Sequence, residues 1–452
     1  MKEESKVHKI IGIVSLGIIG IMIFAISVYA QTPLTLQEAM KVGLDNSKYL
    51  KISELNAVVA QEKYHEVNST RWASLAFQGR YTRLSPVPTF MLTLPPSIPV
   101  FGGQSFPISQ NVYNNYDLQL SVQQPIFTGF QLENASKAAR DNVQAATYDT
   151  KANKSDLKVQ IATAYWTVYN ALQANEFMQE NLDRTEAHYK QAQDLLAQGM
   201  LTQSDVLSAK VQVSNSRLLL LDAQNRLRLA AVALNNILGV PLNTEYTITS
   251  VPQAGDTTLP DIGKLLQEAL DNRSELHSLE LKVKAAGAAV AAAWGAYLPQ
   301  VSVVGNYYYQ RPNQRILPTL DAFRQTWDAS VVVSLPIWNW GQTASKVDQA
   351  RAQRQQAELA EQQTADAVYL DVTQSYLNFK QSKDKIAVAE TAVKDAEESY
   401  RISDQKFKVG LVTNTDLMDA EVALLQAKLN YSQALTELEI ARVNLEKATG
   451  QL

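Results

Sequence analysis

Cysteine is absent from this chain of 452 residues, and that absence excludes several kinds of chemistry. Without a thiol there is no disulfide, no thiolate nucleophile, no cysteine-ligated metal and no lipid attached through cysteine. The four histidines (His8, His65, His188 and His277) are scattered and form no metal-binding pattern such as HExxH. We expect the last three to lie on helix surfaces. The sequence therefore predicts no metal site and no cofactor.

An excess of basic residues is also missing. The chain carries 41 Lys and Arg against 45 Asp and Glu, for a net charge of -4. Nucleic-acid binding needs a concentrated basic surface, so we expect no nucleic-acid partner. No phosphate-binding glycine loop, Ser/His/Asp set or paired-carboxylate hydrolase pattern is present either. The sequence offers no catalytic residues, and an enzyme is not expected.

Proline and glycine are few and clustered, with 15 and 18 residues respectively. Residues 132–198 contain neither, and neither do residues 343–409. Each stretch predicts a helix of about 67 residues, on the order of 100 Å long at 1.5 Å per residue. A helix of that length has no globular core to lie on. We expect it to coil against partner helices.

The N-terminus has the features of a signal peptide, which we assign to residues 1–30. Lys2, Lys6 and Lys9 precede the apolar run "IIGIVSLGIIGIMIFAISV", and "VYA" ending at Ala30 supplies the small residues that signal peptidase requires. Export across the inner membrane follows. The run is also about as long as a transmembrane span, so an uncleaved anchor is the alternative.

The chain contains two copies of one pattern, which we place at 31–239 and 261–452 on either side of a linker at 240–260. Upstream matches, such as Gly79 with Gly305 and Tyr81 with Tyr307, share one offset in residue number, 305 - 79 = 226. Downstream matches share a smaller offset, 410 - 199 = 211. The first copy therefore carries 15 extra residues, the difference between these two offsets, in a surface loop. The downstream matches are Pro125 and Pro336, Tyr165 and Tyr376, Gly199 and Gly410, Asp205 and Asp416, and Gly239 and Gly450.

Each copy reads as helix, strand, strand, long helix and returning helix, with β-hairpins at 74–126 and 298–337. Apolar and polar residues alternate in the strands, and the proline-rich segments 85–103 and 311–320 read as hairpin loops. This alternation fits a membrane barrel or a soluble sandwich. The smallest membrane barrels use eight strands and open edges are not tolerated in lipid, so four membrane strands need several chains to share one barrel. Alternating apolar residues include Leu118, Leu120 and Val122 in the first copy, and Trp327, Ala329, Val331, Val333 and Leu335 in the second.

The returning helices carry apolar residues spaced alternately three and four apart. Such a heptad stripe predicts a left-handed coiled coil, and alanine at every second place allows neighbouring helices to approach closely. An ordinary amphipathic core helix is the alternative, but it would show a wider face. In the second copy the stripe is Leu417, Ala420, Leu424, Ala427, Tyr431, Ala434, Leu438, Ala441, Leu445 and Ala448, and in the first it runs from Val206 to Ile237.

The turns between long and returning helices are also duplicated. Gly199 and Gly410 stand where a helix C-terminus favours a left-handed residue. Thr202 with Asp205, and Thr413 with Asp416, then form capping-box patterns for the next helix. Asp419 follows in the first turn, where a carboxylate favours the positive end of the helix dipole. Spacing alone favours a capping role for these aspartates.

The paired strands, the strand ends "PIF" and "PIW", the two "G-x-x-T-x-x-D" tips and "ALDNRSEL" together resemble the TolC-like outer-membrane efflux protein family. This resemblance covers essentially the whole mature chain. It implies a homotrimer in outer-membrane lipid, with twelve strands in one shared β-barrel and twelve helices packed as a coiled-coil α-helical barrel. The implied fold class is mainly α with transmembrane β.

The resemblance also implies roles for the tips. Asp416 and Asp419 match two aspartates that constrict the periplasmic entrance, and Asp205 matches one that latches the closed tip. Phe407 stands where a latch tyrosine is expected and Val412 where an arginine is expected, so that polar latch cannot form as such. By resemblance the aspartates are gate residues.

The family implies a passive exit duct that works with an inner-membrane transporter and a periplasmic adaptor. Two alternatives remain open from the sequence. The same fold serves type I protein secretion, where the cargo is a polypeptide. A periplasmic coiled-coil adaptor or scaffold belongs to another class, and it should lack the two strand pairs.

Overall fold

The computed structural model describes residues 32–89, 91–107, 111–253 and 261–452. The predicted signal peptide and linker residues 254–260 lie outside the described residues. Contacts divide the chain into two compact units. Unit 1 comprises the described residues 32–46, 160–253 and 385–439, and unit 2 comprises 47–159, 261–384 and 440–452. Each unit holds parts of both sequence copies, so the predicted boundaries remain divisions of the sequence.

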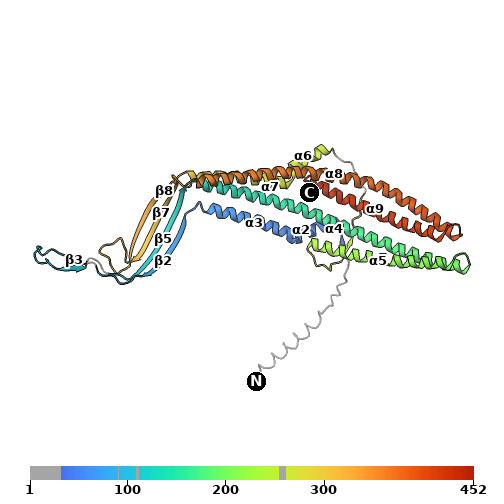
Figure 1. The fold of residues 1–452 in the computed structure, drawn as a ribbon, viewed down its shortest axis with the longest axis horizontal. Helices are drawn as coiled ribbons and strands as arrows, with labels where there is room; N and C mark the ends of the chain where they lie inside the picture. The colour runs from blue at the N-terminus through green and yellow to red at the C-terminus, as the bar shows by residue number, and fades with distance from the viewer. Residues whose placement is uncertain (1–31, 90, 108–110, 254–260) are drawn as a thin grey trace, which may run out of the picture. The chain divides into compact units, whose positions relative to one another are not determined.

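Unit 2 contains a four-stranded antiparallel sheet (Figure 1). Its order is β2-β5-β7-β8. The alternation of apolar and polar residues made these four strands predictable, and both predicted hairpins are present. The alternative of a periplasmic coiled-coil adaptor or scaffold, which should lack the two strand pairs, is therefore wrong. The strands are β2 (Ser74–Arg83), β5 (Asn114–Phe127), β7 (Gln300–Arg311) and β8 (Arg324–Ser334).

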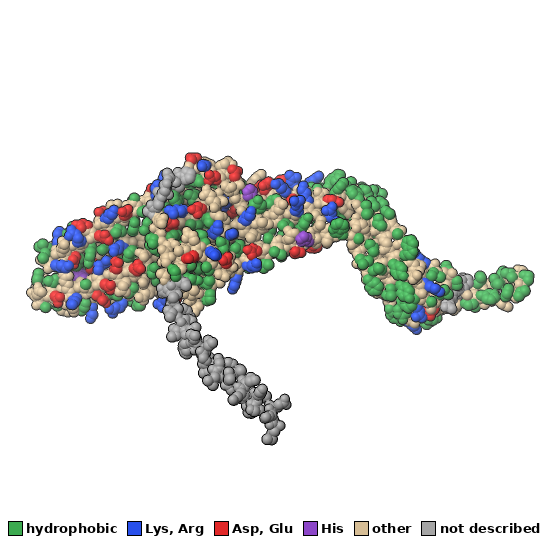
Figure 2. All heavy atoms as spheres, turned by 180° about the vertical axis from the view of Figure 1, so that it is seen from behind, with side chains coloured by type: hydrophobic (Ala, Val, Ile, Leu, Met, Phe, Trp, Pro, Cys, Tyr) green, Lys and Arg blue, Asp and Glu red, His purple; other side chains and the backbone are tan. Residues whose placement is uncertain are grey.

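The two faces of the sheet differ in chemistry. In the registered pairs, Leu120 of β5 lies opposite Phe77 of β2 and Tyr307 of β7, which groups apolar side chains on one face. Figure 2 shows hydrophobic side chains covering much of this region. On the other face Asp117 accepts hydrogen bonds from Arg80 Nη2 at 2.9 Å and from Gln310 Nε2 at 2.8 Å. One face suits lipid and the other suits water.

The loop between β2 and β5 is more ordered than the sequence predicted. Its many prolines indicated a loop without strands, but β3 (Met91–Thr93) and β4 (Ser105–Pro107) pair antiparallel within it. Each strand has only three residues, and β4 ends at Pro107, because proline cannot donate to a ladder and is confined to strand ends and edges. The corresponding second-copy segment, 312–323, forms no strand.

The four long helices match their predicted extents closely. They are α4 (Gln131–Ala197), α5 (Gln203–Leu238), α8 (Gln342–Lys408) and α9 (Asn414–Ala448). The heptad stripe of α9 is also confirmed, because eight of its ten residues are buried and Tyr431 and Leu445 are half-buried. Among the described residues, no helix combines the length and apolar character needed to cross a bilayer.

The helix that opens each copy is two helices rather than one. The breaks fall at Ser47 and Arg273, which are repeat equivalents because they differ by the upstream offset. The Ser47 side chain caps its helix by accepting from Leu50 N at 3.3 Å, whereas Arg273 makes no side-chain cap and instead pairs with Asp371 of α8 at 2.6 Å. The helices are α2 (Leu36–Asn46) and α3 (Lys48–Ser69) in the first copy, and α6 (Ile262–Asn272), α7 (Ser274–Trp294) and the short 3₁₀ turn η1 (Gly295–Tyr297) in the second.

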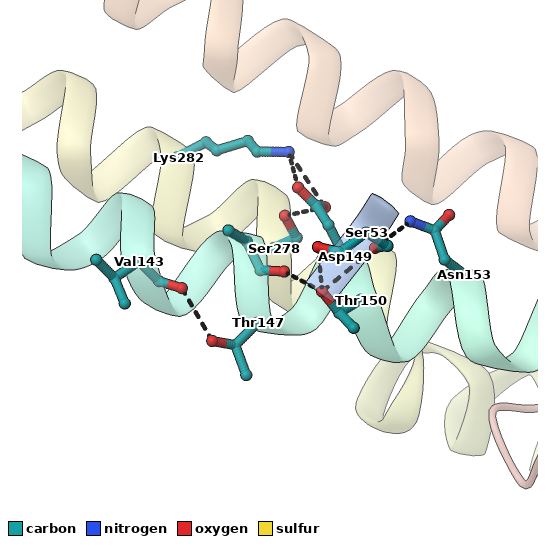
Figure 3. A network of polar contacts seen from close by, with 9 residues as sticks. Ser53, Val143, Thr147, Asp149, Thr150, Asn153, Ser278 and Lys282 are labelled. Atoms are coloured by element: carbon teal, nitrogen blue, oxygen red, sulfur yellow. Dashed lines mark hydrogen bonds and ion pairs between the residues drawn. The ribbon is translucent and has the colours of Figure 1, made fainter. Parts of the chain in front are cut away.

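A polar network joins α3, α4 and α7 within unit 2 (Figure 3). Asp149 of α4 accepts from Ser278 Oγ at 2.5 Å and from Lys282 Nζ at 2.9 Å, both on α7. One turn further along α4, Asn153 Nδ2 donates to Ser53 Oγ of α3 at 2.8 Å. The network fixes these three helices beside one another.

Unit 1 includes two short strands that the sequence did not indicate. β1 (Thr32–Leu34) and β6 (Tyr246–Ile248) pair in parallel. Tyr165 of α4 holds both segments, because its hydroxyl donates to Leu34 O at 2.8 Å and accepts from Ser250 N at 3.0 Å. Three-residue strands contain too little alternation to be recognised from sequence.

Candidate functional site at the helical hairpin tips

Two tip turns in unit 1 connect α4 to α5 and α8 to α9. Gly199 and Gly410 have φ values of 76° and 72°, in the left-handed region that favours glycine. In the second tip, Gly410 N donates to Phe407 O at 3.0 Å and Leu411 N donates to Lys406 O at 2.9 Å. The first tip has the same two bonds, which form a Schellman-type helix end. The predicted C-terminal glycines are confirmed.

Both predicted capping boxes are present. Asp205 Oδ2 accepts from Thr202 N at 2.9 Å, and Asp205 N donates to Thr202 Oγ1 at 3.3 Å. In the second tip Asp416 Oδ2 accepts from Thr413 N at 2.8 Å, and Asp416 N donates to Thr413 Oγ1 at 3.2 Å. The threonine hydroxyl and amide that donate to each carboxylate hold the pKa of Asp205 and Asp416 below its ordinary value. Both aspartates therefore stay ionised at neutral pH.

Asp416 and Asp419 share one face of α9. Both are exposed, whereas the intervening Leu417 and the adjacent Ala420 are buried. Asp419 makes no hydrogen bond or ion pair within the part of the chain that the structure describes. Its carboxylate therefore faces solvent in one chain, where a neighbouring copy or an ion could meet it.

An apolar cluster joins the two tips. It consists of Leu195 from α4, Phe407 from α8 and Leu417 from α9, and Val412 packs against it. Phe407 is only 2% exposed. Apolar side chains therefore pack between the two tips at the positions where the resemblance indicates a polar latch. Asn414 Nδ2 adds one polar contact, donating to the backbone oxygen of Asp205 at 3.4 Å.

A buried polar pair lies beside this cluster. His188 of α4 and Glu421 of α9 are 5% and 1% exposed, and Nδ1 lies 3.7 Å from Oε2. The ring of Phe407 packs edge-on against His188, with the centroids 5.0 Å apart. His188 Nε2 and both Glu421 oxygens have no hydrogen-bond partner among the described residues. An unsatisfied buried carboxylate is costly, so this pair is a weak point in the packing between the tips.

Comparison with known proteins agrees with this architecture. The model of one family, "Outer membrane efflux protein", matches residues 44–240 and 265–451. The chain belongs to this family. Among known members, it is 22% identical to "Probable efflux pump outer membrane protein TtgC" of Pseudomonas putida over 92% of this chain and 82% of that protein. It is 25% identical to "Outer membrane protein TolC" of Escherichia coli over 69% of this chain and 64% of that protein.

Solved structures show the same fold. The CusC structure superposes with a TM-score of 0.78 at 17% identity, covering 93% of both chains. The Campylobacter jejuni CmeC outer membrane channel superposes with a TM-score of 0.76 at 16% identity, covering 92% of this chain and 85% of that one. The outer-membrane location and the fold class of this efflux protein follow from the family.

Three tip residues of this outer membrane efflux protein were missed from the sequence. Asn414 is the residue after a capping threonine and carries no pattern of its own. His188 was expected on a helix surface, and that prediction was wrong because the second hairpin covers it. Glu421 directly follows Ala420 of the apolar heptad stripe without belonging to it, so the stripe gave no signal of its burial. Across the described ranges, no group of three His, Cys, Asp or Glu side chains is placed to hold a metal ion.

Proposed function

We propose that this outer membrane efflux protein is the exit channel of a tripartite efflux system. Three copies share one β-barrel in the outer membrane and one helical tunnel across the periplasm, and small molecules leave through it. The observation that best supports this proposal is a four-stranded sheet with one apolar face and two open edges, in the same chain as two long helical hairpins. Four strands cannot close a barrel, whereas three times four exceeds the minimum of eight.

The channel is passive, and its energy comes from partners. The sequence contains no nucleotide-binding motif and no catalytic set, so an inner-membrane transporter must drive the flow. A periplasmic adaptor connects that transporter to the hairpin tips. The name of the Pseudomonas putida relative, an efflux pump component, favours small-molecule efflux over protein secretion as the activity.

Asp416 and Asp419 are the proposed gate. Their exposure on one face of α9 leaves them free to line an entrance, while Leu417 and Ala420 beside them are held in the packing. Three copies bring six carboxylates around the axis. A ring of carboxylates attracts cations and disfavours anions, because the charges are close and only partly screened. The capping bonds of Asp416 keep that carboxylate fixed in position.

Single-channel recording in lipid bilayers tests the gate. Asp416→Asn with Asp419→Asn removes the charge and keeps the side-chain size, so we expect a clearly weaker preference for cations. Asp395→Asn with Glu397→Gln is the matched control, since both residues are exposed on α8 and unpaired in the described structure. If selectivity is unchanged in the tip variant, the gate assignment is wrong.

A further inference from the structure

The two open edges of the sheet are β2 and β8. Under the proposed function, on which this inference rests, β8 of one chain meets β2 of a second copy. The register of that contact is not visible in one chain. The internal repeat supplies it, because the chain already contains an equivalent contact.

The repeat offsets hold in three dimensions as well as in sequence. If so, adding the upstream offset of 226 to the residue numbers of β2 should give those of β7, and adding the downstream offset of 211 to those of β5 should give those of β8. The pair Ser74 and Gln123 becomes Gln300 and Ser334, which are partners in the structure. The central pair Gly79 and Leu118 likewise becomes Gly305 and Ala329, which are also partners. The offsets are therefore a structural equivalence of the strands, including their register.

The contact between β5 and β7 is the template for the contact between chains. It joins the second strand of one hairpin to the first strand of the next. In a closed ring of hairpins, β8 and the β2 of the following copy have that same relation. Leu120 pairs with Tyr307, and Val122 pairs with Gly305. Adding the downstream offset of 211 to the β5 residue numbers gives positions in β8, and subtracting the upstream offset of 226 from the β7 residue numbers gives positions in β2. The two pairs become Val331 with Tyr81 and Val333 with Gly79.

We propose that β8 pairs antiparallel with β2 of a second copy in this one register, with Val331 opposite Tyr81, Val333 opposite Gly79 and Leu335 opposite Phe77. The register keeps each apolar side chain beside another on the same face of the barrel. A slip of one residue would place Val331 opposite Arg80, whose guanidinium is bonded to Asp117 on the polar face. Such a slip exchanges lipid-facing and water-facing residues along the strand.

The exposure of β8 fits a missing neighbour. Val331 is 67% exposed, whereas its equivalent in the paired strand β5, Leu120, is 40% exposed. Both are apolar and both lie on the same face of the sheet. The additional exposure is on the side where the second copy would lie.

The length of β8 gives a second and independent indication. β5 has 14 residues and ends at Phe127, which pairs with Val301 after a bulge. β8 has 11 residues and stops at Ser334, before the equivalent residue Trp338. Ile337 and Trp338 are 89% and 75% exposed. The equivalent of the pair Phe127 and Val301 is Trp338 with Leu75 of the second copy, so the neighbour would extend β8 and cover these side chains.

Cysteine crosslinking tests the register directly, since the natural chain has no cysteine. The matched pairs are Val331→Cys with Tyr81→Cys and Leu335→Cys with Phe77→Cys. Residues directly opposite in a sheet have Cβ atoms about 5 Å apart, against about 7–8 Å for diagonal neighbours, and a disulfide needs about 4 Å. We expect oxidation in isolated outer membranes to give roughly fivefold more covalent dimer and trimer from matched pairs than from shifted pairs.

The shifted pairs keep the same face of the barrel and move by two residues. They combine Tyr81→Cys with either Ala329→Cys or Val333→Cys, and the single-cysteine variants set the background. Unboiled gels of each variant confirm that a trimer has assembled. If assembled trimers crosslink through a shifted pair, or through none of the pairs, the proposed register is wrong. If the unaltered chain forms no trimer, the proposed function itself fails, and the gel reports this separately.

Discussion

At the scale of single residues, the buried carboxylate of Glu421 is a cost to the packing of the tips, because neither of its oxygens has a hydrogen-bond partner among the described residues. Its carboxylate is buried between two helical hairpins, and the ion pair that the structure shows for it is a long one to His188. Removing one partner of a buried pair leaves an uncompensated charge, whereas replacing both by apolar groups is often neutral or stabilising. The pair therefore provides specificity at the tip without adding much stability.

A double-mutant cycle tests this view. We expect His188→Phe alone to lower the free energy of unfolding by about 3–5 kcal/mol, because Glu421 then loses its ion-pair partner. The double variant His188→Phe with Glu421→Leu should be at least as stable as the parent. Thermal unfolding followed by helical circular dichroism gives both values. Equal losses in the single and double variants would contradict the prediction.

Spacing alone predicted the glycine turns and the capping boxes, since these depend on residues within a few positions of one another. It could not place Phe407 or His188. Whether either side chain is buried depends on a hairpin that begins or ends hundreds of residues away in the chain. The sequence therefore predicted the turns and helix caps of the tips, but not which of their side chains are buried.

At the scale of elements, the long helices were predictable because their lengths follow from where proline and glycine are absent. The strands β1 and β6 were not, because each has only three residues, and the tyrosine that bonds to both segments lies far away in the sequence. Tyr165 is fully buried, and its hydroxyl bonds to Leu34 O and Ser250 N. Its repeat equivalent, Tyr376, is half-buried against the cluster of Leu265, Ala269 and Val372.

This difference between the two tyrosines gives an internal control. Tyr165→Phe leaves the part-buried amide of Ser250 without its partner, while Leu34 O keeps the bond from Thr249 N at 3.1 Å. We therefore expect a loss of about 1–3 kcal/mol of stability. Tyr376→Phe removes a hydroxyl for which the described structure shows no hydrogen bond, and it should change stability by less than about 0.5 kcal/mol. Hydrogen exchange of residues 246–250 should rise in the Tyr165 variant alone. Equal effects of the two changes would argue against the assigned role of Tyr165.

At the scale of the whole molecule, the two faces of the sheet decide where the chain can reside. Leu120 lies on the apolar face and Ser121 lies on the polar face of the same central strand. A lysine in the lipid-facing position costs about 2–4 kcal/mol near the middle of the bilayer, whereas a lumen-facing lysine is solvated. Neighbouring residues should therefore respond in opposite ways.

We expect Leu120→Lys to reduce the amount of trimer in the outer membrane by several-fold, while Ser121→Lys assembles normally. Membrane fractionation with unboiled gel electrophoresis measures both location and assembly. A reversed order would mean that the faces have been assigned the wrong way round. Similar losses in both variants would mean that this strand does not separate lipid from water.

The sequence by itself determined the number and type of the long elements, the duplication and the open-edged sheet. These depend on periodicity and on the positions of proline and glycine, which are local properties. Only the tertiary structure decided that each compact unit contains parts of both sequence copies. It also decided that the two tips meet through Phe407 and that β5 pairs with β7. Those outcomes depend on side chains meeting across large separations in sequence, and no local pattern records which partner is met.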